Sequence, residues 1–166
     1  MKNTIITIAI ISAGLLGLIW WGSQNTVGSS SSSQEQTGGE SVIVTSEKLY
    51  DFGTISMSKG KVTHTFAVTN PTGKDILVSN LTTSCMCTAA YIVDGSSKIG
   101  PFGMPGMGFV PKANMLIKAG GTRNIDVVYD PNAHGPAGIG SIDRFVYLGE
   151  ADGKTLQLEI KALVTP

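Results

Sequence analysis

A chain of 166 residues with 42% hydrophobic residues has room for one domain of about 100–130 residues plus short appendages, and not for two domains. Lys and Arg together number 12, as do Asp and Glu, and no stretch gathers the basic residues on one face, which excludes a nucleic-acid binder. Two cysteines are too few for a disulfide scaffold.

The first predicted element is a membrane anchor at residues 1–21. Thr4 to Trp21 is an uncharged run rich in Ile and Leu, long enough to cross a bilayer core at about 1.5 Å per residue. Lys2 precedes it, and Trp20-Trp21 suits the membrane interface, so we expect the amino terminus in the cytoplasm and the rest outside. A cleaved signal peptide is the alternative, but no Ala-x-Ala site follows the run.

A flexible linker is predicted at residues 22–40. Ser29 to Ser33 is an unbroken serine run flanked by Gln, Gly and Thr, and such a segment cannot bury apolar area. The folded domain is therefore expected to occupy residues 41–166, held clear of the membrane surface by this tether.

Short stretches of alternating apolar and polar residues fill the rest of the chain. In the clearest of them, Val62, His64, Phe66 and Val68 alternate with Thr and Ala until the turn signal Asn70-Pro71-Thr72-Gly73. Strands are expected at 42–44, 49–55, 62–69, 76–80, 84–93, 114–118, 125–129, 144–148 and 155–164, some of them parts of one bent strand. About seven or eight short strands, with no helical period after Trp21, indicate an all-β, immunoglobulin-like antiparallel sandwich.

The only two cysteines lie in Thr82-Thr83-Ser84-Cys85-Met86-Cys87-Thr88. If this stretch is a strand, Cys85 and Cys87 project from the same face. Three uses of such a pair remain open. The thiols can be buried in the core on the same face as Leu81, Ala89 and Tyr91, or bind a soft metal such as Cu(I), or form a disulfide for redox exchange.

The metal alternative names Cys85, Cys87, Met107 and His134 as ligands, with Met86 and Met104 as further candidates, because thiolates and thioethers favour Cu(I). The redox alternative has two weaknesses. Residues two apart in a strand have Cα atoms near the upper limit of about 6.8 Å for a disulfide, and no partner that lowers a thiol pKa is evident in the sequence.

In order and spacing, five motifs resemble the bacterial family called domain of unknown function 1573. They are Tyr50 to Ile55, Phe66 to Asn70, Thr83 to Thr88, Ile117 to Gly121 and Asp126 to Asp130, within a match from about Val42 to Val164. The resemblance implies an immunoglobulin-like sandwich on envelope proteins and brings no reaction with it. The chain departs from the family pattern at Met86, at Ala119 and in a long insertion from Asp94 to Ala113.

The glycine- and proline-rich part of this insertion, 100–111, is expected either to cap the sandwich or to bind a partner or metal. No motif supports an enzyme. We expect a non-catalytic binding or scaffold module of the cell envelope, anchored to the bacterial plasma membrane by a single span, with an envelope protein as partner. No cofactor is required; a Cu(I) protein and a thiol–disulfide protein are the alternatives.

Overall fold

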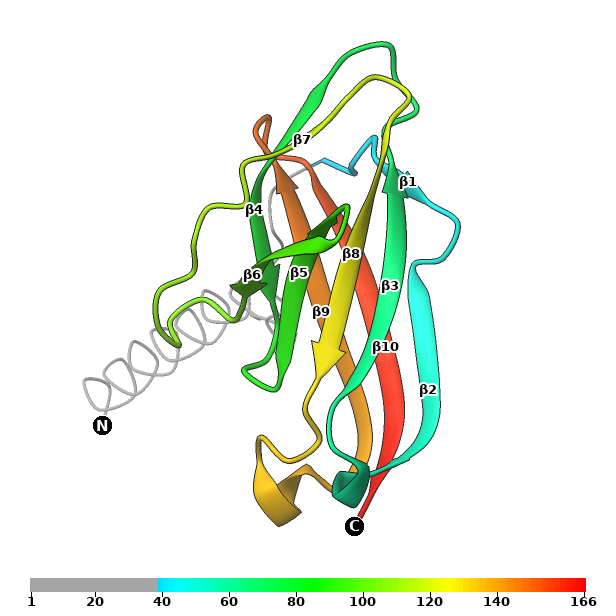
Figure 1. Ribbon diagram of the computed structural model, residues 1–166, viewed down its shortest axis with the longest axis vertical. Helices are drawn as coiled ribbons and strands as arrows, with labels where there is room; N and C mark the ends of the chain where they lie inside the picture. The colour runs from blue at the N-terminus through cyan, green and yellow to red at the C-terminus, as the bar shows by residue number, and fades with distance from the viewer. Residues whose placement is uncertain (1–38) are drawn as a thin grey trace, which may run out of the picture. The chain divides into compact units, whose positions relative to one another are not determined.

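The computed structural model describes residues 39–166, which form two five-stranded β-sheets packed face to face (Figure 1). The predicted anchor, 1–21, and nearly all of the predicted linker lie outside the described residues. Among residues 39–166, no helix has the length and apolar character needed to cross a bilayer.

The first sheet has the strand order β1-β3-β8-β5-β6, and the second has the order β2-β10-β9-β4-β7. The strands of the first sheet are β1 (Val44–Thr45), β3 (Val62–Thr69), β5 (Thr88–Asp94), β6 (Ser97–Phe102) and β8 (Thr122–Tyr129). Those of the second are β2 (Leu49–Ser56), β4 (Ile76–Thr83), β7 (Met115–Ile117), β9 (Gly140–Glu150) and β10 (Thr155–Thr165). Two 3-10 turns, η2 (Met57–Lys59) and η3 (Gly135–Gly138), complete the described residues.

The sequence therefore predicts the all-β sandwich correctly, but the expected strand count of seven or eight is too low. The expectation of a wholly antiparallel sandwich is also wrong at one edge, because β2 runs parallel to β10, with Tyr50 opposite Ile160. All other strand pairs are antiparallel.

The core lies between the sheets and is built by the inward half of each alternating strand. Phe66 on β3 pairs with Ile125 on β8, and both are fully buried, as is Leu158 on the opposite sheet. Burial of each such side chain contributes about 1.5–3 kcal/mol relative to exposure. This dry interior fixes the register of the strands, and thereby the position of the loops at each end.

One strand prediction at the cysteines is wrong. The stretch 84–93, expected to be a strand throughout, is a turn from Ser84 to Cys87 followed by β5. The turn changes the parity of the residues after it: Thr88, Ala90 and Ile92 are buried, whereas Ala89 and Tyr91, expected to face inward, are only half-buried.

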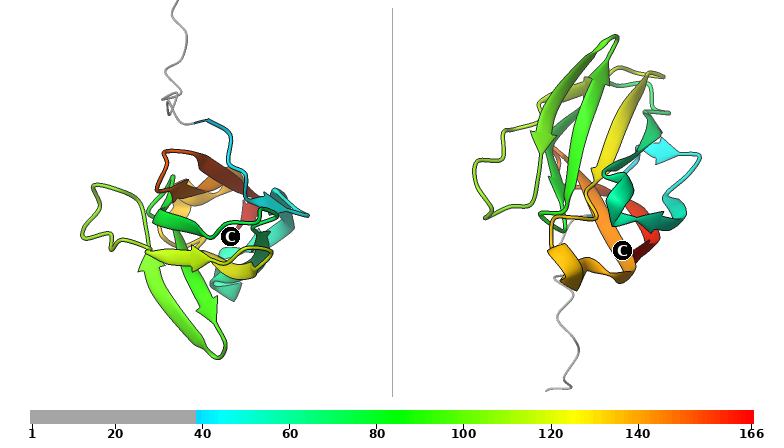
Figure 2. Two further views of the ribbon diagram at one scale, coloured as in Figure 1. Left: turned by 90° about the horizontal axis from the view of Figure 1, so that it is seen from above. Right: turned by 60° about the horizontal axis from the view of Figure 1, so that its bottom comes forward.

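A strand that the sequence analysis did not expect, β6, lies in the first part of the segment described as an insertion, 94–113. Gly95, with φ of 60°, makes the tight turn that pairs Asp94 with Ser97, and Figure 2 shows the resulting hairpin extending beyond the sandwich. The remaining loop, 103–114, connects β6 to β7.

Candidate functional site: a disulfide at one end of the sandwich

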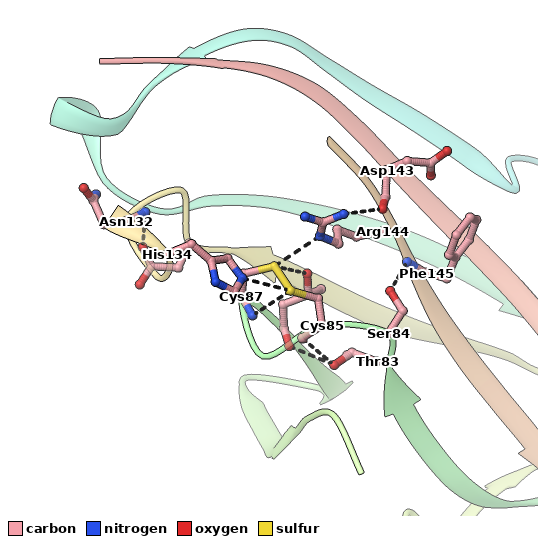
Figure 3. Close-up of a disulfide and its surroundings, with 11 residues drawn as sticks. Thr83, Ser84, Cys85, Cys87, Asn132, His134, Asp143, Arg144 and Phe145 are labelled. Carbon is pink, nitrogen blue, oxygen red and sulfur yellow. Dashed lines mark hydrogen bonds between the residues drawn. A yellow bond between two sulfur atoms is a disulfide. The ribbon is translucent and has the colours of Figure 1, made fainter. Parts of the chain in front are cut away.

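Three segments that are far apart in the sequence meet around the cysteines (Figures 1 and 3). They are the turn between β4 and β5, the loop between β8 and β9, and the first residues of β9. Backbone hydrogen bonds join them: the Asp130 N–H donates to the Cys87 carbonyl at 2.8 Å, and the Ser84 N–H donates to the Phe145 carbonyl at 2.9 Å. The local backbone is thus fixed from two sides.

Cys85 and Cys87 are joined by a disulfide, with their Cα atoms 5.2 Å apart. The turn conformation makes this possible, because it brings the two residues closer than an extended strand would. Thr83 secures the turn: its buried hydroxyl lies 3.0 Å from the carbonyl oxygens of both Cys85 and Thr88. The two sulfurs lie side by side because of a turn, and the expectation that they project from one face of a strand is wrong.

The two cysteines differ in exposure. Cys87 is 2% exposed and joins the hydrophobic core, while Cys85 is half-buried and only packs against it. Met86, between them, is exposed. The alternative in which both cysteines are buried in the core is therefore met by Cys87 but not by Cys85.

Each sulfur has its own nitrogen partner (Figure 3). The Nε2 atom of His134 lies 3.3 Å from Cys85 Sγ, and Nε of Arg144 donates to Cys87 Sγ at 3.3 Å. The Cys87 backbone N–H also donates to Cys85 Sγ at 3.3 Å. The sequence argument that the cysteines lack a partner able to stabilise a thiolate is therefore wrong.

The loop that carries His134 is held by its own hydrogen bonds. The Asp130 side chain accepts from the Asn132 N–H at 2.9 Å, and the Asn132 amide donates to the Met57 carbonyl at 2.8 Å, which ties the loop to η2. His134 itself is exposed. Its imidazole is thus presented to the disulfide from the solvent side by an ordered loop.

The four metal ligands named from the sequence are only partly brought together. One ligand atom each from Cys85, Cys87 and His134 lies within 4.8 Å of the others. Met107 and Met104 lie in the separate loop 103–114, where Met107 is 58% exposed. Two sulfurs and an imidazole are a donor set suited to Cu(I) or Zn, but they can bind an ion only after the disulfide is reduced to thiolates.

Arg144 is the site residue that sequence reasoning missed. It lies next to Tyr129, a residue of the core, and burial raises the pKa of Tyr129 while the charge of Arg144 partly offsets that effect. Nothing in the sequence signals this placement, since Arg144 stands among alternating residues of an ordinary strand.

Two surface hollows of the described residues do not include the residues around the disulfide. One, of about 370 Å³, is lined mostly by polar residues, including Glu40, Lys48 and Thr155. Another, of about 300 Å³, lies along β2 and β10. Neither hollow is lined by Cys85, Cys87, His134 or Arg144.

Comparison with known proteins confirms the family resemblance over part of the chain. A family model described as "Protein of unknown function (DUF1573)" matches residues 43–101, which include the Cys-x-Cys motif. No curated protein sequence matches this chain.

Solved structures with a similar fold include a Porphyromonas gingivalis W83 protein of unknown function, with 15% identity and a TM-score of 0.54. The match covers 74% of this chain and 46% of that protein, so this chain spans about half its length. Weaker similarity extends to a PapD-like domain of human CEP192 (13% identity, 76% and 87% of the two chains, TM-score 0.45). It also extends to the YadV chaperone (12% identity, 76% and 53%, TM-score 0.44). At these identities the comparisons establish the fold and nothing finer.

Proposed function

We propose that this chain is a non-catalytic binding module of the bacterial cell envelope, anchored to the plasma membrane through residues 1–21 with the sandwich outside. The uncharged run from Thr4 to Trp21 supports the anchor. The Cys85–Cys87 disulfide supports the location, because disulfides persist mainly in oxidising compartments outside the cytoplasm.

The observation that carries the binding role is the presentation of Phe109, which is 92% exposed. The loop that bears it, 103–114, is fixed at both ends to β4: the Thr83 N–H donates to the Gly103 carbonyl at 3.2 Å, and the Ala113 N–H donates to the Ser79 carbonyl at 2.9 Å. Figures 1 and 2 show the loop standing out from the side of the sandwich.

An exposed aromatic residue on an anchored loop is suited to protein recognition. Burying a Phe side chain in a partner contributes about 1.5–3 kcal/mol, and Met107 on the same loop adds a second adaptable apolar contact. Aromatic residues are also among those enriched at the cores of protein interfaces. The partner surface is therefore expected to be an apolar pocket on another envelope protein.

Site-specific photo-crosslinking in living cells tests this proposal. A photoreactive amino acid is placed at Phe109 of the full-length protein and, as the matched control, at Leu163, which is exposed on β10. We expect one discrete adduct from position 109 and none from position 163. Equal or absent adducts at the two positions would contradict a binding role for the loop.

A second candidate function, Cu(I) binding, is favoured by one specific observation, the grouping of Cys85, Cys87 and His134 within 4.8 Å. In the reduced protein the two thiolates and the imidazole would hold the ion, and this donor set suits Cu(I). Cu(I) would there serve as cargo or as a redox centre.

Anaerobic competition for Cu(I), with the reduced full-length protein in mild detergent, tests the second candidate. We expect at least nanomolar competition that is lost in the Cys85→Ser/Cys87→Ser variant and weakened about tenfold or more in His134→Ala. Met107→Leu, which alters a sequence-predicted ligand outside the cluster, is expected to leave the affinity unchanged. Failure of the unaltered protein to compete rules the candidate out.

A further inference from the structure

The two sulfurs of the Cys85–Cys87 disulfide have different surroundings, and the difference indicates which of them a thiolate attacks. Cys85 is half-buried and faces the exposed His134, whereas Cys87 is buried against the core and contacts Arg144. Because Cys85 is the more exposed of the two residues, a thiolate that approaches from solvent is expected to attack Cys85 Sγ. Attack at Cys85 makes Cys87 the leaving group (Figure 3).

Arg144 is placed to stabilise that leaving group. Its guanidinium is always protonated, and Nε already points at Cys87 Sγ from 3.3 Å. The Nη1 atom donates to the Asp143 carbonyl at 2.8 Å, which holds the guanidinium in place. A charge-assisted hydrogen bond is stronger to a thiolate than to a neutral disulfide sulfur, so Arg144 favours the reduced state.

From this asymmetry we infer a function beyond binding: the disulfide exchanges two electrons with cysteine pairs of partner proteins, with Cys85 as the attacked sulfur and Cys87 as the leaving thiolate. The partner class is an exposed dithiol, or in the reverse direction an exposed disulfide. Cys85 is partly exposed beside the exposed His134, which is the side from which such a chain segment would approach.

The exchange balances in two steps. A thiolate of the partner dithiol attacks Cys85 Sγ, the Cys85–Cys87 bond breaks, and Cys87 leaves as a thiolate beside Arg144. The second partner thiolate then attacks the partner sulfur of the mixed disulfide, which releases Cys85 as a thiolate beside His134. The partner dithiol is oxidised by two electrons, the domain is reduced by two, and the two thiol protons of the partner pass to solvent or to the released sulfurs.

The size of the ring supports exchange over a structural role. A disulfide between residues two apart closes a very short loop, so it restricts very little of the unfolded chain and adds little stability by the loop-entropy relation. A bridge that adds so little stability, yet has a separate partner at each sulfur, is better explained by its chemistry.

The first test uses single-cysteine variants of the full-length protein in mild detergent, with glutathione disulfide as the probe. The chain has no other cysteine, so the product mass reports one site. We expect Cys87→Ser, which leaves Cys85, to form the mixed disulfide at least tenfold faster than Cys85→Ser, which leaves Cys87. Equal rates, or faster reaction of the Cys85→Ser variant, would overturn the assignment.

The second test measures the reduction equilibrium of the disulfide in dithiothreitol redox buffers, with thiols trapped by alkylation. Arg144→Gln is expected to make the reduced form about tenfold less favourable, a shift of about 30 mV to more negative potential. Arg123→Gln, which removes an arginine of β8 that pairs with Asp94, is the matched control and is expected to shift nothing. An equal shift in both variants, or none in either, would overturn the role of Arg144. Circular dichroism confirms that each variant is folded.

Discussion

Asn70 is completely buried where the chain leaves β3, and its side chain connects two parts of the sandwich. Its amide lies within hydrogen-bond distance of the carbonyl oxygens of Lys74 (2.7 Å), Ile117 (3.0 Å) and Lys118 (3.2 Å). Its side-chain oxygen accepts from the backbone N–H and the hydroxyl of Thr72. The Asn70 side chain therefore provides hydrogen-bond partners both for the turn after β3 and for the carbonyl groups at the end of β7.

Asn70→Ala is expected to lower the free energy of unfolding by about 2–4 kcal/mol, because it leaves several buried polar groups without partners. Asn132→Ala, which removes an exposed amide bonded to the Met57 carbonyl, is expected to cost less than about 1 kcal/mol. Urea unfolding followed by fluorescence measures both. Similar losses in the two variants would show that Asn70 does not have this connecting role.

Asp126 on β8 is a buried carboxylate with two partners. Lys98 Nζ lies 2.6 Å from one oxygen, and the Thr65 hydroxyl donates to the other at 2.6 Å. Burial alone raises the pKa of Asp126, but the hydrogen bonds from Lys98 and Thr65 and the charge of Lys98 outweigh it and hold the pKa below the ordinary value of 3.8.

This lowered pKa predicts a loss of stability in acid. The unfolded chain takes up the proton first as the pH falls, so the contribution of Asp126 is fully present above its unfolded pKa and is lost as the pH falls through the folded value. The stability difference between the unaltered protein and Asp126→Asn should therefore shrink between about pH 5 and pH 3. Unfolding in urea at each pH measures it.

The control for this prediction is Asp152→Asn. The Asp152 carboxylate is exposed and pairs with Lys154 in the β9–β10 turn, where solvent screens the interaction. The difference in free energy of unfolding between the unaltered protein and Asp152→Asn should be small at every pH. A constant difference for Asp126→Asn across the same range contradicts the account of the buried pair.

At the scale of elements, the turn between β4 and β5 is held by more than its disulfide. The Thr88 N–H donates to the Cys85 carbonyl at 3.1 Å, and the buried Thr83 hydroxyl lies beside two carbonyl oxygens of the turn. Adjoining strands add hydrogen bonds at Ser84 and Cys87. The turn is therefore expected to keep its conformation when the sulfurs are reduced.

Reduction of the disulfide is expected to leave the sandwich folded and to lower its free energy of unfolding by only about 1–2 kcal/mol, in line with the small closed loop. Urea unfolding with and without a reductant measures the change. The Cys85→Ser/Cys87→Ser variant serves as a control that cannot respond to the reductant. Unfolding on reduction at moderate temperature would show that the bridge is structural.

Strands whose two faces meet different environments could be predicted from the sequence. In β3 and β10 apolar residues alternate with polar ones, so the period of two is visible, and the turn at Asn70-Pro71-Thr72-Gly73 is marked by its residue types. The hairpin of β9 and β10 was marked in the same way by Glu150 to Gly153.

The turn at the cysteines and the partners of the sulfurs could not be predicted. Ser84 to Cys87 contains no glycine or proline, so nothing in it interrupts an apparent strand. His134 and Arg144 reach the sulfurs from 49 and 57 positions along the chain, a proximity set by the tertiary arrangement and not by local pattern. Of the ligands named from sequence, Met107 lies in the separate loop 103–114, and its position relative to the cysteines depends on the tertiary arrangement.

At the scale of the whole molecule, the account requires that the sandwich lie outside the cytoplasm. The apolar run before it, the serine-rich linker and the disulfide are each consistent with export. The proposed module would combine two surfaces that lie on different loops, the apolar loop with Phe109 and the turn that carries the cysteines.

The redox state of the two cysteines in growing cells tests the central claim most directly. Cells are quenched in acid, free thiols are alkylated, and the mass of the full-length protein is compared before and after reduction. The account predicts that most of the protein carries the Cys85–Cys87 disulfide and gains two alkyl groups only after reduction. Alkylation of both cysteines in untreated cells would contradict an exported, disulfide-bonded site.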